Sequence, residues 1–90
     1  MGVKIHIHQT HRHLADDQAV VEVEGDTVGA CLTQLVARYP ALEPEIFDAG
    51  GGLSTRIDIY HNLESAYPEE LKRTVAPGDE IHLTMLLAGG

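Results

Sequence analysis

The sequence predicts one domain of the α+β class, a mixed sheet of four to five strands with one main helix packed across one face. Four segments alternate apolar and polar residues, which is the period of a strand with one buried face: 3–8, 19–24, 55–60 and 80–86. Between the second and third of them, residues 28–39 place apolar side chains at helical spacing. Because 90 residues leave little room for a second domain, we assign 1–90 to one domain with a flexible tail over 86–90.

Two strands open the chain. In residues 3–8 we expect the odd-numbered apolar residues to face the core and the even-numbered residues to face solvent: Lys4, His6 and His8. Residues 9–18 are mostly polar and predict a hairpin loop. Alternation resumes in residues 19–24, where we expect Val21 and Val23 to point inward.

The main helix is predicted over residues 28–39. Gly25 stops the second strand, and either Asp26 or Thr27 can serve as the N-cap residue. Pro40 ends the helix because it lacks a backbone N–H to continue the ladder. The buried stripe of this helix is expected to be Val28, Cys31, Leu32, Leu35, Val36 and Tyr39.

The second half of the chain is less regular. Residues 41–47 predict a short helical turn whose apolar side chains lie under the core: Leu42, Ile46 and Phe47. Three consecutive glycines make residues 48–54 a predicted flexible loop. A third strand follows at 55–60, and His61-Asn62 is predicted to begin a turn. Residues 63–76 stay open between loop and helix. Leu71 and Val75, at helical spacing, could form one turn there.

A predicted tight turn precedes the last strand. Pro77-Gly78-Asp79 is typical of a tight turn, and alternation over 80–86 directs Ile81 and Leu83 inward. The first and last strands show strong alternation, so we expect them to pair in the centre of the sheet.

Charge and cysteine content limit the partners and the compartment. The chain has 14 acidic and 6 basic residues, and its net charge of −8 excludes nucleic acid and anionic membrane as partners. It fits a protein that docks on a basic protein surface. Cys31 is the single cysteine and no apolar run is long enough to span a membrane, so we expect a cytoplasmic protein.

Three features together resemble a known family. They are the Gly25-Asp26-Thr27 lead-in to the helix, the turn into the last strand at 77–81, and the ending Leu87-Ala88-Gly89-Gly90. With the order of elements, they resemble the ubiquitin-like β-grasp sulfur carriers of the MoaD/ThiS family. That family includes the small subunit of molybdopterin synthase and the carriers of thiamine and cysteine biosynthesis.

The resemblance implies a sulfur carrier and not an enzyme. Gly90 would be adenylated at its C-terminal carboxylate and then converted to a thiocarboxylate, while Gly89 lets the tail pass through a narrow channel. Leu86, Leu87 and Ala88 would dock this tail on a partner. The partners implied are an E1-like activating enzyme and a sulfur-accepting synthase. The sequence has no phosphate-binding Gly-x-x-x-x-Gly-Lys loop, so we expect no bound cofactor and assign ATP to the activating enzyme.

Two related functions stay open with the same tail. The chain could be a ubiquitin-like modifier joined through Gly90 to lysines, or the small subunit of a permanent complex such as molybdopterin synthase. The pathway that receives the sulfur is equally open among cofactor, cysteine and specialised-metabolite biosynthesis.

Histidines supply a candidate from another class. His6, His8, His11 and His13 form an H-x-H-x-x-H-x-H run, and imidazole is a common metal ligand. The sequence nevertheless favours no metal site, because no carboxylate or cysteine is fixed beside the run. His82 would lie beside His6 or His8 if the end strands pair, and we assign His6 and His82 to a partner-binding face. Cys31 is predicted to be a buried, inert thiol.

Overall fold

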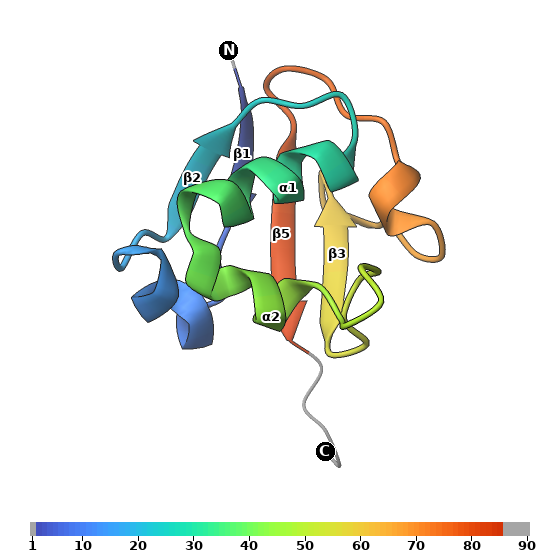
Figure 1. Ribbon diagram of the computed structural model, residues 1–90. Helices are drawn as coiled ribbons and strands as arrows, with labels where there is room; N and C mark the ends of the chain where they lie inside the picture. Colours follow the sequence, from blue (N-terminus) through green and yellow to red (C-terminus); the bar gives the residue numbers. More distant parts are fainter. Residues whose placement is uncertain (1, 86–90) are drawn as a thin grey trace.

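The computed structural model describes residues 2–85, which form one five-stranded sheet in the order β2-β1-β5-β3-β4 (Figure 1). The strands are β1 (Val3–His6), β2 (Val20–Val23), β3 (Ile57–His61), β4 (Glu64–Ser65) and β5 (Glu80–Met85). β1 and β5 are parallel, and every other neighbouring pair is antiparallel. The predicted mixed sheet and the central pairing of the end strands are therefore confirmed.

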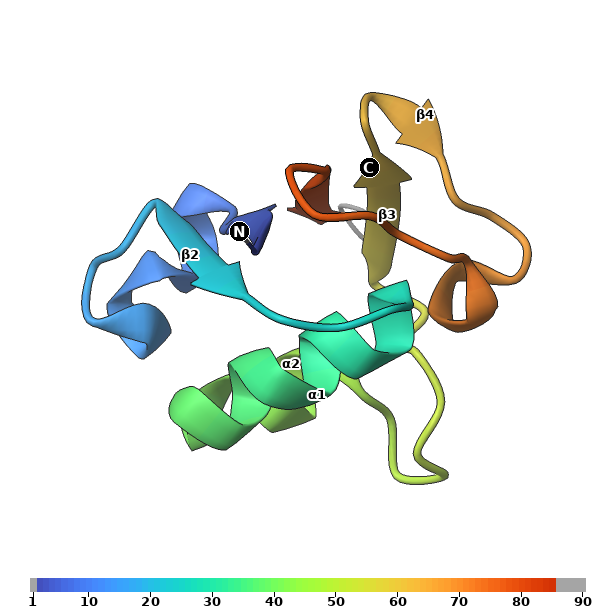
Figure 2. The ribbon, with the colours of Figure 1, turned by 90° about the horizontal axis from the view of Figure 1, so that it is seen from above.

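One layer of helices covers one face of the sheet. Figure 2 shows α1 (Val28–Arg38) and the short α2 (Glu43–Ile46) on the same side of the strands. Three 3₁₀ turns complete the chain: η1 (Gln9–Ala15), η2 (Pro40–Leu42) and η3 (Glu70–Lys72). Among residues 2–85, no helix has the length and apolar character that a membrane crossing requires.

The core lies between the sheet and α1. The inward positions predicted from strand alternation are buried, and Ile5 and Ile81 pair side by side at its centre with no exposed surface. The helical stripe is also confirmed, with Val36 and Tyr39 half-buried against the core. The fully buried part of that stripe is Val28, Cys31, Leu32 and Leu35.

Thr27, and not Asp26, caps α1. Its hydroxyl oxygen accepts a hydrogen bond from the Ala30 N–H at 3.1 Å, which satisfies one donor at the helix start. The helix ends at Arg38, and Pro40 begins η2 as its missing N–H allows. The predicted helical turn over 41–47 is present as η2 and α2, with Leu42 and Ile46 buried.

Two loop predictions are corrected by tertiary contacts. Residues 9–18 are not a plain hairpin loop, because residues 9–15 form η1. His8 caps this turn by accepting a hydrogen bond from the Thr10 N–H. The strand predicted to reach His8 ends at His6. In the open stretch 63–76, only residues 70–72 are helical. Val75 instead donates its N–H to Asp26 O at 2.9 Å, so it belongs to the segment that runs beside the entry to α1.

The predicted turn after β3 is confirmed, and it forms a hairpin whose second strand was not predicted. Asn62 and Leu63 have φ angles of 51° and 71°, the pair of positive values that a two-residue type I′ turn requires. The turn leads directly into β4, which pairs Tyr60 with Ser65. Leu63 is an unusual residue for such a turn, and this is why the sequence did not indicate a hairpin.

The glycine loop after α2 is closed by contacts. Phe47 and Leu53 form a β-bridge, and Asp48 Oδ1 accepts from the N–H groups of Gly50 and Gly52 at 2.9 and 3.0 Å. The predicted flexibility of 48–54 stays a prediction. The tail 86–90 lies outside the described residues.

Candidate functional site

The predicted reactive tail lies just beyond the part of the chain that the structure describes. Five of the predicted site residues belong to this segment: Leu86, Leu87, Ala88, Gly89 and Gly90. The structure does show the strand that leads into it. β5 lies between β1 and β3, and its pairing with β3 runs from Ile81–His61 to Met85–Ile57. A strand that begins in the centre of the sheet and stays paired with β3 to Met85 therefore carries the chain to the predicted tail.

The face of the sheet opposite α1, here called the outer face, carries the other predicted site residues. Strand register places one residue from each strand in a row across this face: Val20, His6, His82, Tyr60 and Ser65. Val20, on the edge strand β2, is 38% exposed. A hollow lined by His6, His8, Val20 and Thr84, among others, lies along this row. The outer face can therefore receive another protein segment.

His6 and His82 are brought into direct contact, as the predicted pairing requires. They are register partners of β1 and β5, and their rings stack with centroids 4.0 Å apart and planes 5° from parallel. Glu80, two residues before His82, lies on the same face, and its Oε1 is 2.5 Å from His6 Nε2. The sequence-based reason for rejecting a metal, that no carboxylate stands beside these histidines, is therefore wrong for His6.

The environment of His82 disfavours its charged form. Burial lowers the pKa of His82, the neighbouring His6 lowers it further, and Glu80 opposes these effects. Its Nδ1 is buried and has no hydrogen-bond partner among the described residues. A buried ring nitrogen without a partner is uncommon and calls for an explanation.

The remaining histidines of the run do not join this cluster. His8 Nδ1 contacts Thr10 at the start of η1, and His11 is buried with its Nε2 3.1 Å from Glu45 Oε1. His13 is exposed in η1. The 3₁₀ turn has separated residues that an extended loop could have gathered, so the four-histidine run does not form one site.

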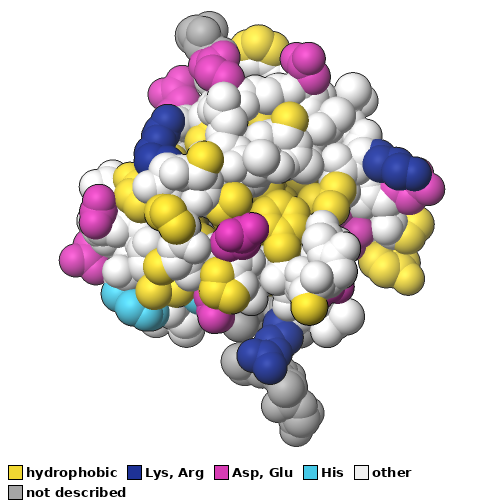
Figure 3. All heavy atoms as spheres, in the orientation of Figure 1, with side chains coloured by type: hydrophobic (Ala, Val, Ile, Leu, Met, Phe, Trp, Pro, Cys, Tyr) yellow, Lys and Arg dark blue, Asp and Glu magenta, His cyan; other side chains and the backbone are white. Residues whose placement is uncertain are grey.

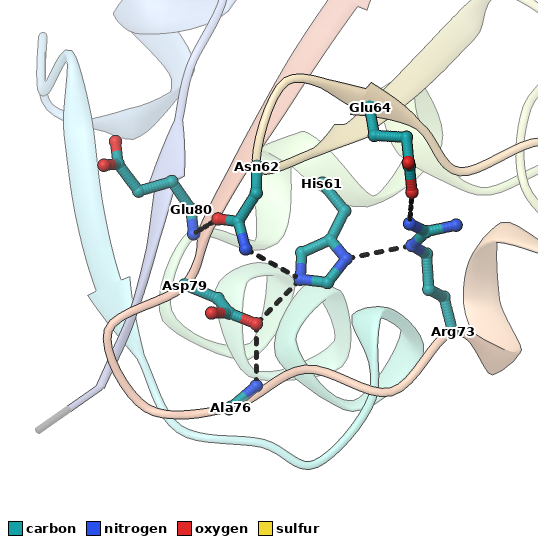
Figure 4. Close-up of polar contacts among 7 residues, drawn as sticks. All are labelled: His61, Asn62, Glu64, Arg73, Ala76, Asp79 and Glu80. Atoms are coloured by element: carbon teal, nitrogen blue, oxygen red, sulfur yellow. Dashed lines mark hydrogen bonds and ion pairs between the residues drawn. The ribbon is translucent and has the colours of Figure 1, made fainter.

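A second polar cluster was missed by sequence reasoning (Figure 4). His61 Nε2 donates to Asp79 Oδ2 at 2.7 Å, and His61 Nδ1 accepts from Arg73 Nε at 2.9 Å. Arg73 also pairs with Glu64 in β4. These partners are 12 and 18 residues from His61, so no local motif marked them. The cluster links the ends of β3 and β4 to the turn before β5.

This network stabilises the Asp79 carboxylate. Hydrogen bonds from His61, from the Ala76 N–H and from Asn62 lower the pKa of Asp79 to about 2. The guanidinium at His61 Nδ1 requires that nitrogen to accept, which leaves the ring proton on Nε2, facing Asp79. The polar groups of this cluster bond to one another, and together they position the turn that leads into β5.

The face of the molecule covered by α1 and α2 carries an apolar hollow. Figure 3 shows hydrophobic side chains gathered in a hollow beside α1 and α2, with acidic side chains around it. The hollow has a volume of about 670 Å³ and is lined by residues that include Val36, Phe47 and Glu43. Cys31 lies deeper, fully buried as predicted, and burial, followed by Asp26 and Glu24, raises the pKa of its thiol. A neutral thiol without solvent access is a poor nucleophile.

Known proteins resemble this chain over most of its length. The model of the ThiS family matches residues 5–90. Small archaeal modifier protein 1 of Haloferax volcanii is 41% identical over 71 residues, which are 78% of this chain and 78% of that protein. Sulfur carrier protein CysO of Mycobacterium tuberculosis is 30% identical over 93 residues, which cover 100% of both chains.

The fold agrees with these sequence relationships. The crystal structure of Mycobacterium tuberculosis CysO superimposes with a TM-score of 0.85 at 27% identity, over 94% of this chain and 99% of that one. The ubiquitin-like β-grasp fold expected from the sequence is therefore confirmed.

Proposed function

This chain belongs to the ThiS family, and from that premise we propose that it is a sulfur carrier protein. A separate E1-like enzyme adenylates the C-terminal carboxylate of Gly90, which then becomes a thiocarboxylate and donates its sulfur to a biosynthetic synthase. The observation that carries this proposal is the full-length similarity to the sulfur carrier CysO, together with the ending Leu87-Ala88-Gly89-Gly90. The protein serves enzymes as their substrate, in the cytoplasm.

Activation is needed because a carboxylate is a poor electrophile. Attack of the Gly90 carboxylate oxygen on the α-phosphorus of ATP forms an acyl adenylate and releases pyrophosphate. A hydrosulfide equivalent then attacks the acyl carbon, expels AMP and loses its proton, which leaves the thiocarboxylate. Neither step uses a side chain of this protein, whose contribution is to position the reacting carboxylate.

The fold supplies a firm base for such a tail. β5 is paired with β1 over residues 80–82 and with β3 as far as Met85, so the strand that leads into the tail is held by β3 up to its last described residue. We assign Leu86, Leu87 and Ala88 to docking in a partner groove, and Gly89 to the passage through the narrow entrance of the adenylation site. Glycine suits that passage because it has no Cβ.

We propose that partner proteins bind to the outer face of the sheet. His6 and His82 lie in the row that crosses it, next to the partly exposed Val20 and the adjoining hollow. The net charge of −8 favours partners with a basic surface and speeds their encounter. The activating enzyme and the synthase are both proposed to use this side, one after the other.

The decisive experiment is activation in solution. The full chain is incubated with ATP, a sulfide source and a cognate E1-like enzyme, and its intact mass is then measured. We expect a mass gain equal to the exchange of one oxygen for one sulfur, confined to the C-terminal peptide. If no activating enzyme from the same genome produces this gain, the sulfur-carrier function is wrong.

Truncation provides the matched control. Deletion of Gly90 removes the reacting carboxylate but no residue of the described sheet, so we expect loss of the mass gain and unchanged thermal unfolding. A His13→Ala variant, altered at an exposed residue of η1 away from β5, should be activated like the parent chain.

A second candidate is conjugation to other proteins. It is favoured by the 41% identity to small archaeal modifier protein 1. Here the Gly90 adenylate would be attacked by a lysine amine, which forms an isopeptide bond and releases AMP. Digestion of the source proteome should then yield lysines that carry the C-terminal remnant of this chain; their absence, with thiocarboxylate present, leaves the carrier function alone.

A further inference from the structure

We propose that His6, Glu80 and His82 form a binding site for a divalent transition-metal ion such as zinc on the outer face of the sheet. Each residue offers one ligand atom, and the three atoms all lie within 4.8 Å of one another. Two imidazoles and one carboxylate are a recognised ligand set for such ions. The site differs from the four-histidine run, because only His6 belongs to both.

The spacing of the ligand atoms is close to what an ion needs. Ligand atoms of a tetrahedral zinc ion stand about 2.1 Å from the metal and therefore roughly 3.4 Å from one another. His6 Nε2 and Glu80 Oε1 are 2.5 Å apart and must separate by about 1 Å, while the other spacings, all within 4.8 Å, must close by at most about 1.4 Å. Shifts of this size are within the reach of side-chain torsions.

The backbone fixes these three positions. β1 and β5 are the two inner strands that pair in parallel, and their register sets His6 directly beside His82. Glu80 and His82 are alternate residues of β5, so both project from the outer face. Because both strands are paired on each side, the ligands begin close together and little order is lost on binding.

A further observation points to an ion. His82 Nδ1 is buried without a hydrogen-bond partner, although nearly all buried polar atoms have one. The side chains of His6 and Glu80 remain 30% and 47% exposed, so an ion can reach them from solvent.

Binding has a structural consequence that can be measured. The lone pairs of an imidazole lie in the ring plane, and the two rings are stacked within 5° of parallel. One ion cannot lie in both planes, so at least one ring must turn about its χ2 torsion, which is broad for histidine. His6 Nε2 must also exchange its contact with Glu80 for a bond to the ion, with any ring proton carried on Nδ1. Metal binding therefore unstacks the pair.

The donor set selects the class of ion. Imidazole nitrogens suit zinc, nickel, cobalt and copper, whereas magnesium and calcium prefer a shell of oxygen atoms. Three protein ligands leave one tetrahedral position for water or for a group of another molecule.

The test is a titration of the tag-free, metal-stripped full chain with zinc and with nickel near neutral pH. We expect one site in the parent chain and a loss of affinity of at least about tenfold in His82→Ala and in Glu80→Gln, since even outer-shell partners of a metal contribute 10- to 100-fold. His13→Ala removes an exposed histidine and should leave the affinity unchanged. Equal losses in His13→Ala and His82→Ala would refute the site, as would a parent chain that binds neither ion.

Histidine ring signals in the NMR spectrum of the parent chain give a readout that needs no variant. Zinc should shift the ring protons of His6 and His82 and leave those of His61, which is held by Asp79 and Arg73, in place. Shifts confined to His8, His11 or His13 would contradict the site even if a metal binds. Since the titration uses neither ATP nor an activating enzyme, its outcome is independent of the sulfur-carrier proposal.

Discussion

His61, the last residue of β3, donates a hydrogen bond across 2.7 Å to Asp79, the residue before β5. Asp79 Oδ2 also accepts from the Ala76 N–H at 2.9 Å, so one carboxylate closes the Pro77-Gly78 turn and ties it to the neighbouring strand (Figure 4). The turn that sets the start of β5 is therefore secured by a contact between residues 18 positions apart. Any residue whose position depends on β5, including Glu80 and His82, depends on this contact.

Asp79→Asn should make the free energy of unfolding less dependent on pH in the acidic range. The pKa of Asp79 is lowered to about 2 from its ordinary 3.8, so its ionised form stabilises the fold above pH 3.8. That contribution is lost as the pH falls from 3.8 toward 2. We expect Asp79→Asn to be the less stable protein at neutral pH, and the difference to shrink across this interval. Urea unfolding at a series of pH values, in buffer with a chelator, measures it.

Glu69→Gln is the matched control for that experiment. It also replaces a carboxylate by an amide, at an exposed position whose side chain makes no hydrogen bond among the described residues. Its unfolding free energy should run parallel to that of the parent chain. If the Asp79→Asn curve does the same, the network around His61 does not stabilise the carboxylate.

Gly29→Ala should destabilise the fold even though alanine is the better helix former. A Cβ at this position in α1 would lie 2.8 Å from the carbonyl oxygen of Leu71, a backbone atom of η3. Alanine contributes up to about 1 kcal/mol through helix propensity. Overpacking against backbone costs about 1–3 kcal/mol, so we expect a net loss in the free energy of unfolding, measured by urea denaturation.

The same substitution at Gly52 separates crowding from chain entropy. A Cβ there would meet only Asp48 carboxylate oxygens at 3.7 and 3.8 Å, which is ordinary contact. Both changes restrict the unfolded chain alike. Gly52→Ala should therefore be neutral or slightly stabilising; an equal loss at both positions would show that the approach of η3 to α1 is not the cause.

Two threonines of α1 should respond to alanine with opposite signs. Thr27 caps the helix by accepting from the Ala30 N–H, so Thr27→Ala should cost about 1 kcal/mol of stability. Thr33 is exposed within the helix, where alanine has the higher propensity, and Thr33→Ala should gain a few tenths of a kcal/mol. Thermal unfolding of both variants measures the contrast. Equal effects would mean that the Thr27 hydroxyl does not act as a cap.

Local patterns were enough for the regular elements. Alternation in 3–8, 19–24, 55–60 and 80–86 indicated β1, β2, β3 and β5, and the helical stripe indicated α1 with its buried face. These signals survive because one face of each element must leave water, whatever surrounds it. A turn was expected from His61-Asn62, but its hairpin geometry and the short β4 were missed, since positive φ at Leu63 is imposed by the pairing of the hairpin and not by its own preference.

For the candidate site too, local patterns predicted one part and missed another. Pairing of the end strands was expected to bring His82 beside His6 or His8, and the register selects His6. The position of Glu80 beside His6 was not expected, because they are 74 residues apart and the parallel register alone brings them together. The spacing of the His6-His8-His11-His13 run likewise does not show which of its members share a site, because η1 carries His11 and His13 away from β1.

Sequence by itself determined the class of fold, the faces of its main elements and the Gly89-Gly90 ending, because these depend on residues close together in the chain. Tertiary structure alone decided which side chains share a site. It set Glu80 against the His6–His82 stack and joined His61 to Asp79 and Arg73. Such contacts arise from strand order and register, which are fixed when the whole sheet closes over its core, and no local period records them.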